Sequence, residues 1–305
     1  MPNIKNSITG DIVSYESTYD YNYIGKLYNH YAEVTLGSHI FQCPPFNMEF
    51  EQTYSIKVPW LVKLKLYNPS KTTIDNCIKN KEIQIDAGYL PFKYENTGYG
   101  TCVKGKIDYS EINKPKFEQS KTDTVLEISI LDSITTTLYK PLKNSYRNQL
   151  LSSILDQILE EVGITLPIGQ MQLGKDLLLK TFVPGIFKNA LDRLCILSES
   201  SWSFNNGQIE IKPANKTVVN KIIELSPKSG LIETVKKYYD KDLAAKYTGK
   251  DLIKFKSLFF PSLKLYSNVM IKDGSGNKKQ YMIVGGRKYF ATHKSSYCEW
   301  EAVSI

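Results

Sequence analysis

Arginine is nearly absent from this sequence. Of 39 basic residues, 36 are lysine and only Arg147, Arg193 and Arg287 are arginine. The guanidinium group suits the bidentate contacts made to phosphates and guanine bases, so its scarcity argues against a surface built to read nucleic acid. The lysines are spread along the chain. We interpret the net charge of +8 mainly as solvated faces, with a weak electrostatic role left open.

Cysteine and histidine are too few and too scattered to suggest a metal site. The five cysteines are odd in number, lie far apart and include no CxxC pair, which argues against a disulfide framework or a zinc site. We interpret them as small hydrophobic residues. His30, His39 and His293 show no close metal-ligand spacing, and no nucleophile signature such as GxSxG occurs. We therefore predict no catalytic, cofactor-binding or metal-ligating residue, and no cofactor.

Long hydrophobic runs are missing as well. No stretch of about eighteen apolar residues occurs, so we expect no membrane-spanning segment. Residues 1–17 show no apolar signal core, which predicts synthesis in a cytoplasm without export by the standard route. With 42% hydrophobic and 23% charged residues, the composition is that of an ordinary globular protein.

Alternating apolar and polar residues predict β-strands in the first and last parts of the chain. Val62, Leu64 and Leu66 alternate with Lys63 and Lys65, the period-two pattern of a strand with one buried face. Further strands are predicted over 81–89, 101–109 and 122–130, with a bulge or tight bend at Gly105. Another is predicted near the end, with Cys298, Trp300, Ala302 and Ser304 on one face.

The middle of the chain changes to helical spacing. Apolar residues three and four apart predict a helix from an N-cap at Asn144 or Ser145 to a C-terminal Gly163. A second helix is predicted after Pro184-Gly185, and Asn205-Asn206-Gly207 predicts a β-hairpin.

Two features of this middle segment could carry catalysis. Asp156, Glu160 and Glu161 lie on the polar face of the first predicted helix, where paired carboxylates could act as acid and base. We favour a solvated acidic face, because nothing indicates a dry pocket around them. Trp202 could stack on a sugar or a base, but we favour a residue that caps the core between hairpin and helix.

The segment VMIKDGSGNKKQYMIV, residues 269–284, contains a small glycine loop followed by two lysines. Gly274 and Gly276 lie two positions apart, and Lys278-Lys279 is not followed by Ser or Thr. The phosphate-binding pattern GxxxxGK[ST] is therefore not met, and no helix start follows it. We predict a hairpin instead, with a bend or bulge at Gly285-Gly286.

The two β-rich parts share an order of patterns. VKGKIDY, a polar loop and TVLEISI in the first part correspond to VGGRKYF, a polar loop and EWEAVSI in the last. We predict an α+β fold, mainly β, in which two related antiparallel β units flank a small α/β domain with two helices and a hairpin. The predicted division is 1–136, 137–220 and 221–305.

The ordered series of segments resembles the baseplate hub proteins of contractile phage tails. That family includes late control D-type proteins and the hubs of phage-tail-like bacteriocins. LKLYNPSKTTIDNCIKNKEIQIDAGY, GTCVKGKIDYSE and DTVLEISILDS look like the family's first β unit. NALDRLCILSESSWSFNNGQIEIKP looks like its small α/β domain, and FKSLFFPSLKLYSNVMI and CEWEAVSI look like its second β unit. The resemblance covers nearly the whole chain.

The resemblance implies a structural protein and no enzyme. Hubs of this family are similar to homotrimers in which each chain contributes two barrels like the tail-tube subunit, so that three chains present six units in a ring. One side of the ring would meet the six-fold tail tube protein and the other the three-fold central spike protein. Baseplate wedge and tape measure proteins are further candidate partners. The released virion or bacteriocin particle is the implied location, and we expect no attached hydrolase domain.

Two other functions stay open on the sequence alone. A cell-wall or carbohydrate-acting enzyme would use Trp202 and the acidic helix face. A basic nucleic-acid-binding module would use the lysines, and its affinity for nucleic acid would fall steeply with salt concentration. We rank both below the structural hub.

Overall fold

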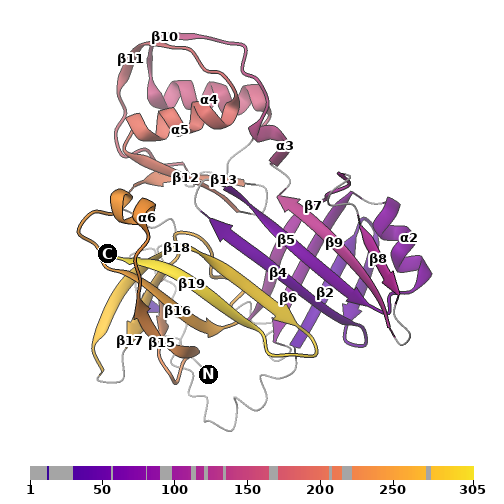
Figure 1. Ribbon diagram of the computed structural model, residues 1–305. Helices are drawn as coiled ribbons and strands as arrows, with labels where there is room; N and C mark the ends of the chain where they lie inside the picture. Colours follow the sequence, from indigo (N-terminus) through magenta and orange to yellow (C-terminus); the bar gives the residue numbers. More distant parts are fainter. Residues whose placement is uncertain are drawn as a thin grey trace. The chain divides into compact units, whose positions relative to one another are not determined.

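The computed structural model is mainly β and divides into two compact units, which are described separately (Figure 1). The larger unit comprises Met1–Ser55, Trp60–Leu131 and Val219–Ile305, and the smaller comprises Ile56–Pro59 and Asp132–Val218. No helix in the described part of the chain is long and apolar enough to cross a membrane. The residues described are 12–13, 30–55, 58–79, 81–89, 98–110, 115–119, 123–132, 135–164, 171–205, 208–214, 222–272 and 276–305.

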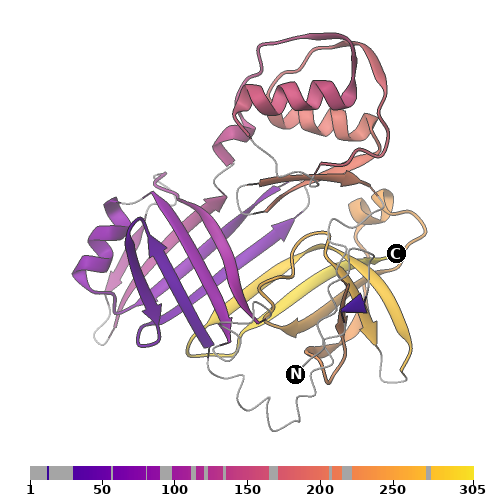
Figure 2. The same ribbon diagram turned by 180° about the vertical axis from the view of Figure 1, so that it is seen from behind.

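The first part of the larger unit is an antiparallel β unit with one helix, drawn from indigo to magenta in Figures 1 and 2. Its alternating burial follows the period-two pattern of the sequence, since Val62, Leu64 and Leu66 are buried. The elements are β2 (His30–Leu36), β3 (His39–Cys43), β4 (Asn47–Ser55), β5 (Val58–Tyr67), α2 (Lys71–Lys79), β6 (Glu82–Tyr89), β7 (Tyr99–Ile107), β8 (Lys116–Gln119) and β9 (Thr124–Asp132).

The second part of the larger unit is another β unit, drawn from orange to yellow in Figures 1 and 2 apart from its short N-terminal strand, which is indigo. Cys298, Trp300 and Ala302 are buried on one face of its last strand, as the sequence predicts, and Val303 is buried too. The elements are β1 (Ile12–Val13), β14 (Ile222–Leu225), β15 (Leu231–Lys237), α6 (Lys241–Lys246), β16 (Leu252–Leu258), β17 (Asn268–Lys272), β18 (Lys278–Ala291) and β19 (Tyr297–Ser304).

The two β units repeat one strand order. The first runs β4-β5-β9-β7-β6-β2 and the second runs β15-β16-β19-β18-β17-β14. They differ at the last strand, because β2 is antiparallel to β6 whereas β14 is parallel to β17. We call these two units the first repeat and the second repeat. The internal similarity that the sequence suggests is thus present in the topology.

The repeats also agree in register. Lys65 on β5 lies opposite Glu127 on β9, and Lys256 on β16 lies opposite Glu299 on β19. One residue away on the buried face, Leu64 lies opposite Ile128 just as Phe255 lies opposite Trp300. The segments VKLKL and IKFKS therefore occupy the same place in their repeats.

One strand pairing joins the two repeats into a single sheet. The 14-residue strand β18 pairs with β17 along its first half and with β4 along its second half, from Gly285 opposite Ser55 to Ala291 opposite Glu49. On the buried side Phe50 of β4 stacks on Phe290 of β18 with ring centroids 5.5 Å apart. We call this β4–β18 pairing the joint.

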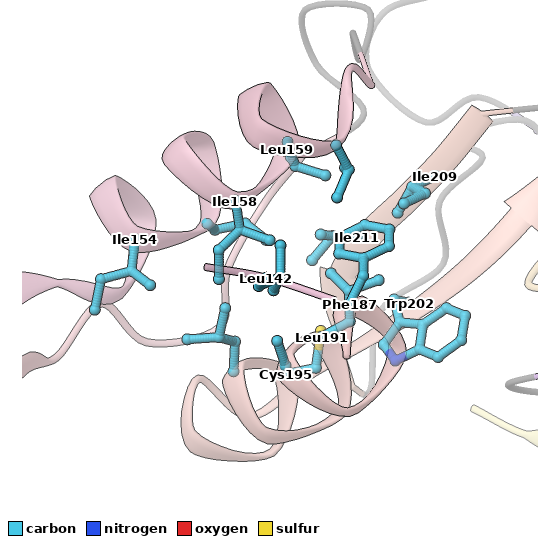
Figure 3. Packing of buried hydrophobic residues seen from close by; sticks show 14 of the residues in the cluster. Leu142, Ile154, Ile158, Leu159, Phe187, Leu191, Cys195, Trp202, Ile209 and Ile211 are labelled. Atoms are coloured by element: carbon cyan, nitrogen blue, oxygen red, sulfur yellow. The ribbon is translucent and has the colours of Figure 1, made fainter. Parts of the chain in front are cut away.

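The smaller unit packs two helices on a β-hairpin. Figure 3 shows residues of α4, α5 and β13 meeting in one apolar cluster, which includes Ile158, Leu191 and Ile211. The spacing of apolar residues along both helices explains why one stripe of each is buried. The elements are α3 (Thr135–Leu138), β10 (Tyr146–Leu150), α4 (Leu151–Val162), β11 (Leu178–Phe182), α5 (Phe187–Leu197), β12 (Ser200–Asn205) and β13 (Gln208–Pro213).

The fold-class prediction is confirmed, and so are both predicted hairpins. β12 pairs with β13 and β17 pairs with β18 in antiparallel register, although the tips of both hairpins lie outside the described residues. The register between β18 and β19 shifts between Ile283 and Gly285, at the place where a bulge is predicted. The division into 1–136, 137–220 and 221–305 stays a prediction.

Two local predictions are wrong. The first helix begins at Leu151 and not after Asn144 or Ser145, because residues 146–150 form β10 and pair with β11. Its predicted end is right, since Gly163 has a left-handed backbone. A bulge at Gly105, one of the two alternatives predicted there, is wrong as well, because Gly105 pairs regularly with Ile83 and the register shift lies between Ile85 and Asp86.

Gly286 in the joint can be tested by substitution. Its φ is +141°, and a Cβ there would lie 2.2 Å from the Glu299 carbonyl oxygen. We expect Gly286→Ala to lower the free energy of unfolding by about 3 kcal/mol, because both backbone strain and a clash oppose it. Gly100→Ala on β7 is the control, since its nearest contact would be 3.8 Å away. Equal stability of the two variants in urea denaturation would contradict this account.

Candidate functional site: the polar face of the joined sheet

The solvent-facing side of the second repeat carries a row of alternating charges that begins at the joint. Arg287 on β18 lies opposite Glu299 on β19, which lies opposite Lys256 on β16, which lies opposite Glu233 on β15. Arg287 Nε donates to Glu299 Oε2 at 2.7 Å, and Lys256 Nζ lies 3.3 Å from Glu233. Opposite charges placed directly across strands stabilise a sheet, so this row favours the observed pairing of these four strands.

The row is bounded by a second ion pair and by aromatic rings. Lys254 Nζ lies 2.8 Å from Glu301 in the next row, and Lys256 Nζ lies 4.0 Å above the ring of Tyr297. A groove of about 590 Å³ is lined by Lys254, Lys256 and Glu301 together with Arg287, Glu233 and Thr53. The charged side chains of the groove form ion pairs with one another, so few of its charges are free.

Glu49 on β4 binds side chains of both repeats beside this row. Its carboxylate accepts hydrogen bonds from Tyr67 at 2.9 Å, from Tyr289 at 2.8 Å and from Lys294 at 3.2 Å, and Lys65 Nζ lies 4.0 Å away. Burial alone would raise the pKa of Glu49, but these hydrogen bonds outweigh it and hold the pKa below its ordinary value. Glu49 therefore ties β5 and β18 to β4 while charged.

Lys288 lies on the opposite, buried side of the joint. It is 1% exposed, its Nζ donates to the Pro261 carbonyl at 2.7 Å, and it lies 5.3 Å from the ring centroid of Tyr54. Removal from water lowers its pKa. Among the described residues no carboxylate lies within ion-pair distance of its Nζ, so the amine is held by a carbonyl and by aromatic faces.

The residues considered for catalysis in the sequence have structural contacts. Trp202 is 1% exposed, and its Nε1 donates to Asp192 at 3.0 Å, so the prediction that it caps the core is confirmed. Glu161 accepts a hydrogen bond from the Lys143 backbone amide at 2.7 Å, which fixes the chain before β10. Asp156 and Glu160 are exposed on α4, as a solvated face requires.

The cysteines and histidines are mainly packing residues. All five cysteines are free and buried, and burial raises the pKa of Cys43 and of Cys77 to about 12. His30 is buried with a lowered pKa, and His293 packs edge-on against Tyr67. Within the described ranges no three His, Cys, Asp or Glu side chains are grouped as a metal site.

The two lysines that follow the glycine loop of the segment 269–284 bind carboxylates within the chain. Lys278 lies 2.9 Å from Glu224, which is 3% exposed, and Lys279 contacts Asp251, which also lies 3.5 Å from Lys237. The first of these pairs links the hairpin to β14. The second links it to the turn before β16. These lysines therefore bind carboxylates of the same chain and not a phosphate.

The polar face itself was not predicted from the sequence. Its residues are ordinary Lys, Glu and Arg on alternating strands, and only the register brings them together. One signal was available, because Lys-x-Lys in both VKLKL and IKFKS stands opposite a strand with glutamate. Reading those two segments as equivalent would have indicated the matched Lys–Glu rows.

Comparison with solved structures shows the fold. The 43 kDa tail protein of prophage MuSo2 from Shewanella oneidensis matches with a TM-score of 0.62 and 10% identity over 90% of this chain and 98% of that one. A tail protein from Neisseria meningitidis MC58 matches with a TM-score of 0.60 and 9% identity, covering 90% and 97%. No protein-family model and no curated protein matches this sequence.

A third structure extends the likeness to secretion systems. An E. coli component of the type VI secretion system, itself similar to the bacteriophage T4 tail proteins gp27 and gp5, matches with a TM-score of 0.59. Identity is 12%, and the match covers 89% of this chain and 76% of that one. At such identities the likeness establishes that this chain has the fold of these tail proteins.

Glu49 makes the stability of the fold depend on acid pH. Because its pKa is lowered on folding, the folded chain binds this proton less tightly than the unfolded chain does. The stabilisation is present above the ordinary glutamate pKa and is lost as pH falls through the folded pKa. We expect Glu49→Gln to cost about 2 kcal/mol at pH 7 and little at strongly acid pH. Denaturation at several pH values measures this, with Glu160→Gln as the exposed control; parallel curves for wild type and Glu49→Gln would refute it.

The basic group of Lys288 also makes the stability of the fold depend on pH. Its lowered pKa means that the folded chain binds the proton less tightly, so stability rises as pH rises from the folded pKa towards the ordinary lysine value. We expect Lys288→Met to raise stability at pH 7 by about 1 kcal/mol and to remove this slope. Lys63→Met on the exposed face of β5 serves as control. A less stable variant with an unchanged slope would show that the carbonyl and ring contacts outweigh the burial cost.

Proposed function

We propose that this protein is the structural baseplate hub of a contractile injection particle, a phage tail or an R-type bacteriocin. In this role three chains form a ring that adapts the six-fold tail tube to the three-fold central spike. The proposal extends the tail-protein fold and the family resemblance of the sequence to a specific place in the particle.

The observation that carries the proposal is the duplication inside one chain. Two repeats with the same strand order lie edge to edge and are joined by β4 and β18. Three such chains would supply six similar units to a ring whose true symmetry is three-fold. The six similar repeats of such a ring could contact a six-fold partner. Features that occur in only one of the two repeats would be present three times and could contact a three-fold partner.

The polar face suits the wall of a conduit. Its ion pairs are closed between neighbouring strands, as between Arg287 and Glu299, so a passing polymer would meet few free charges. The cross-strand pairs also stiffen the sheet, which a passage of fixed width needs. We propose that this face lines the channel, with the tail tube protein on one side of the ring and the spike protein on the other.

The remaining parts of the proposal follow from the same role. Baseplate wedge or tape measure proteins would contact the hub from outside or inside the ring. The predicted parts 1–136 and 221–305 would be the tube-like units, and 137–220 an attached domain. Assembly would occur in the bacterial cytoplasm, and the hub would leave the cell in the released particle.

The residues that the two alternative functions would need are engaged in the fold. A carbohydrate-acting enzyme would need Trp202 exposed, and its ring is buried in the core. A nucleic-acid-binding module would need free lysines, whereas Lys65, Lys254 and Lys256 lie beside carboxylates on the polar face. We therefore propose no enzymatic role.

The mass of the purified protein in solution tests the proposal. Native mass spectrometry and light scattering at micromolar concentration should give three times the 34.8 kDa chain mass. Mixing with the tail tube protein of the same particle should shift this species to a larger complex. A monomer that binds no tail protein at low salt would contradict the hub role.

A further inference from the structure

Two described strands, β8 in the first repeat and β15 in the second, each have an edge equivalent to one of the two edges that pair in the joint. Within the described residues the path of paired strands runs β8-β9-β5-β4-β18-β19-β16-β15, so β8 and β15 are its ends. Six strands separate them along this path. Each end strand has a partner on one side only among the described strands, and an exposed strand edge is a template for pairing with another chain.

The end strands hold the same positions as the strands of the joint. In the second repeat Arg287 of β18 lies opposite Glu299, and in the first repeat Lys116 of β8 lies opposite Glu127. Since Glu127 and Glu299 are equivalent, β8 corresponds to the half of β18 that pairs with β4. β15 corresponds to β4, because both are the first strands of their repeats in the shared order.

We infer that β8 of one chain pairs with β15 of a second copy of this chain, in the antiparallel manner in which β18 pairs with β4 inside the chain. This inference rests on the proposed function, because it supplies the contact that closes the ring. Two different surfaces of one chain meet in it, which is the head-to-tail arrangement that generates rings.

An exposed apolar residue of the β8 edge fits this contact. Phe117 on β8 is 51% exposed. Phe117 takes the place of Lys288, because Phe117 lies opposite Leu126 as Lys288 lies opposite Cys298. Lys288 is buried beside Gln52 of β4 in the joint, so β15 of the next copy would bury Phe117 in the same way.

The register of the joint predicts which charges meet. Tyr289 of β18 faces Glu51 of β4, and Glu118 of β8 is the equivalent of Tyr289. Glu49 and Glu233 are equivalent because they lie beside Lys65 and Lys256.

β15 has one extra residue after Glu233, since its register with β16 shifts before Lys236. Lys236 therefore takes the place of Glu51 and faces Glu118 of the neighbouring chain. Lys236 is 74% exposed and Glu118 is exposed, so an oppositely charged pair would form between copies.

A charge swap tests this pairing with little risk to the fold, because both side chains are exposed. We expect Glu118→Lys to raise the concentration at which half of the chains are assembled about tenfold or more, and Lys236→Glu to do the same. The double variant should return to within about threefold of wild type. Lys63→Glu, on the polar face away from both edges, controls for net charge.

The outcomes separate this inference from the hub role. If wild type is a trimer and Glu118→Lys remains one, or the double variant does not recover, the β8–β15 pairing is overturned while the hub role stands. If wild type is a monomer that binds no tail protein, both are overturned. As a second readout, Glu118→Cys with Lys236→Cys should give disulfide-linked dimers and trimers on oxidation, and either single variant should not. Absence of these species from an assembled trimer would also overturn the pairing.

Discussion

The pairing of β4 with β18 is the contact on which the rest of the larger unit depends. It joins two repeats that would otherwise each expose a strand edge, and it covers both faces of the junction. On the inside Phe50, Phe259 and Phe290 pack ring against ring, with centroids 5.0 to 6.1 Å apart. On the outside Arg287 bridges Glu51 and Glu299. A change on either face therefore affects the relation between repeats.

The charged side chains on this sheet mainly form ion pairs between neighbouring strands. The chain carries an excess of lysine, yet the lysines of the polar face lie beside glutamates on neighbouring strands. Each exposed ion pair contributes little to stability by itself, but a row that crosses several strands selects one register. A rigid sheet with few unpaired charges has the properties of a scaffold and of a channel wall, and these are the properties from which we argue the function.

Periodicity explains how much of this structure could be predicted. Strands such as β5 and helices such as α5 have one buried face, and that pattern is written in the spacing of Leu, Ile and Val. Partners distant in the chain leave no such local pattern. Residues 146–150 form β10 only because β11 pairs with them, and Glu49 meets Tyr289 only because β4 pairs with β18. The duplication was indicated by the similar order of patterns in the two β-rich parts. The register that makes Lys65 equivalent to Lys256 could be assigned only from the paired strands.

The symmetry of the assembled particle tests the central claim most directly. Averaged electron-microscope images of the purified protein, viewed along the axis, should show a ring around an open channel. The ring should have six similar lobes and true three-fold symmetry, because each chain supplies two repeats that are related but not identical. Images of single compact particles without a channel, or of rings whose number of lobes is not twice the number of chains, would contradict the account.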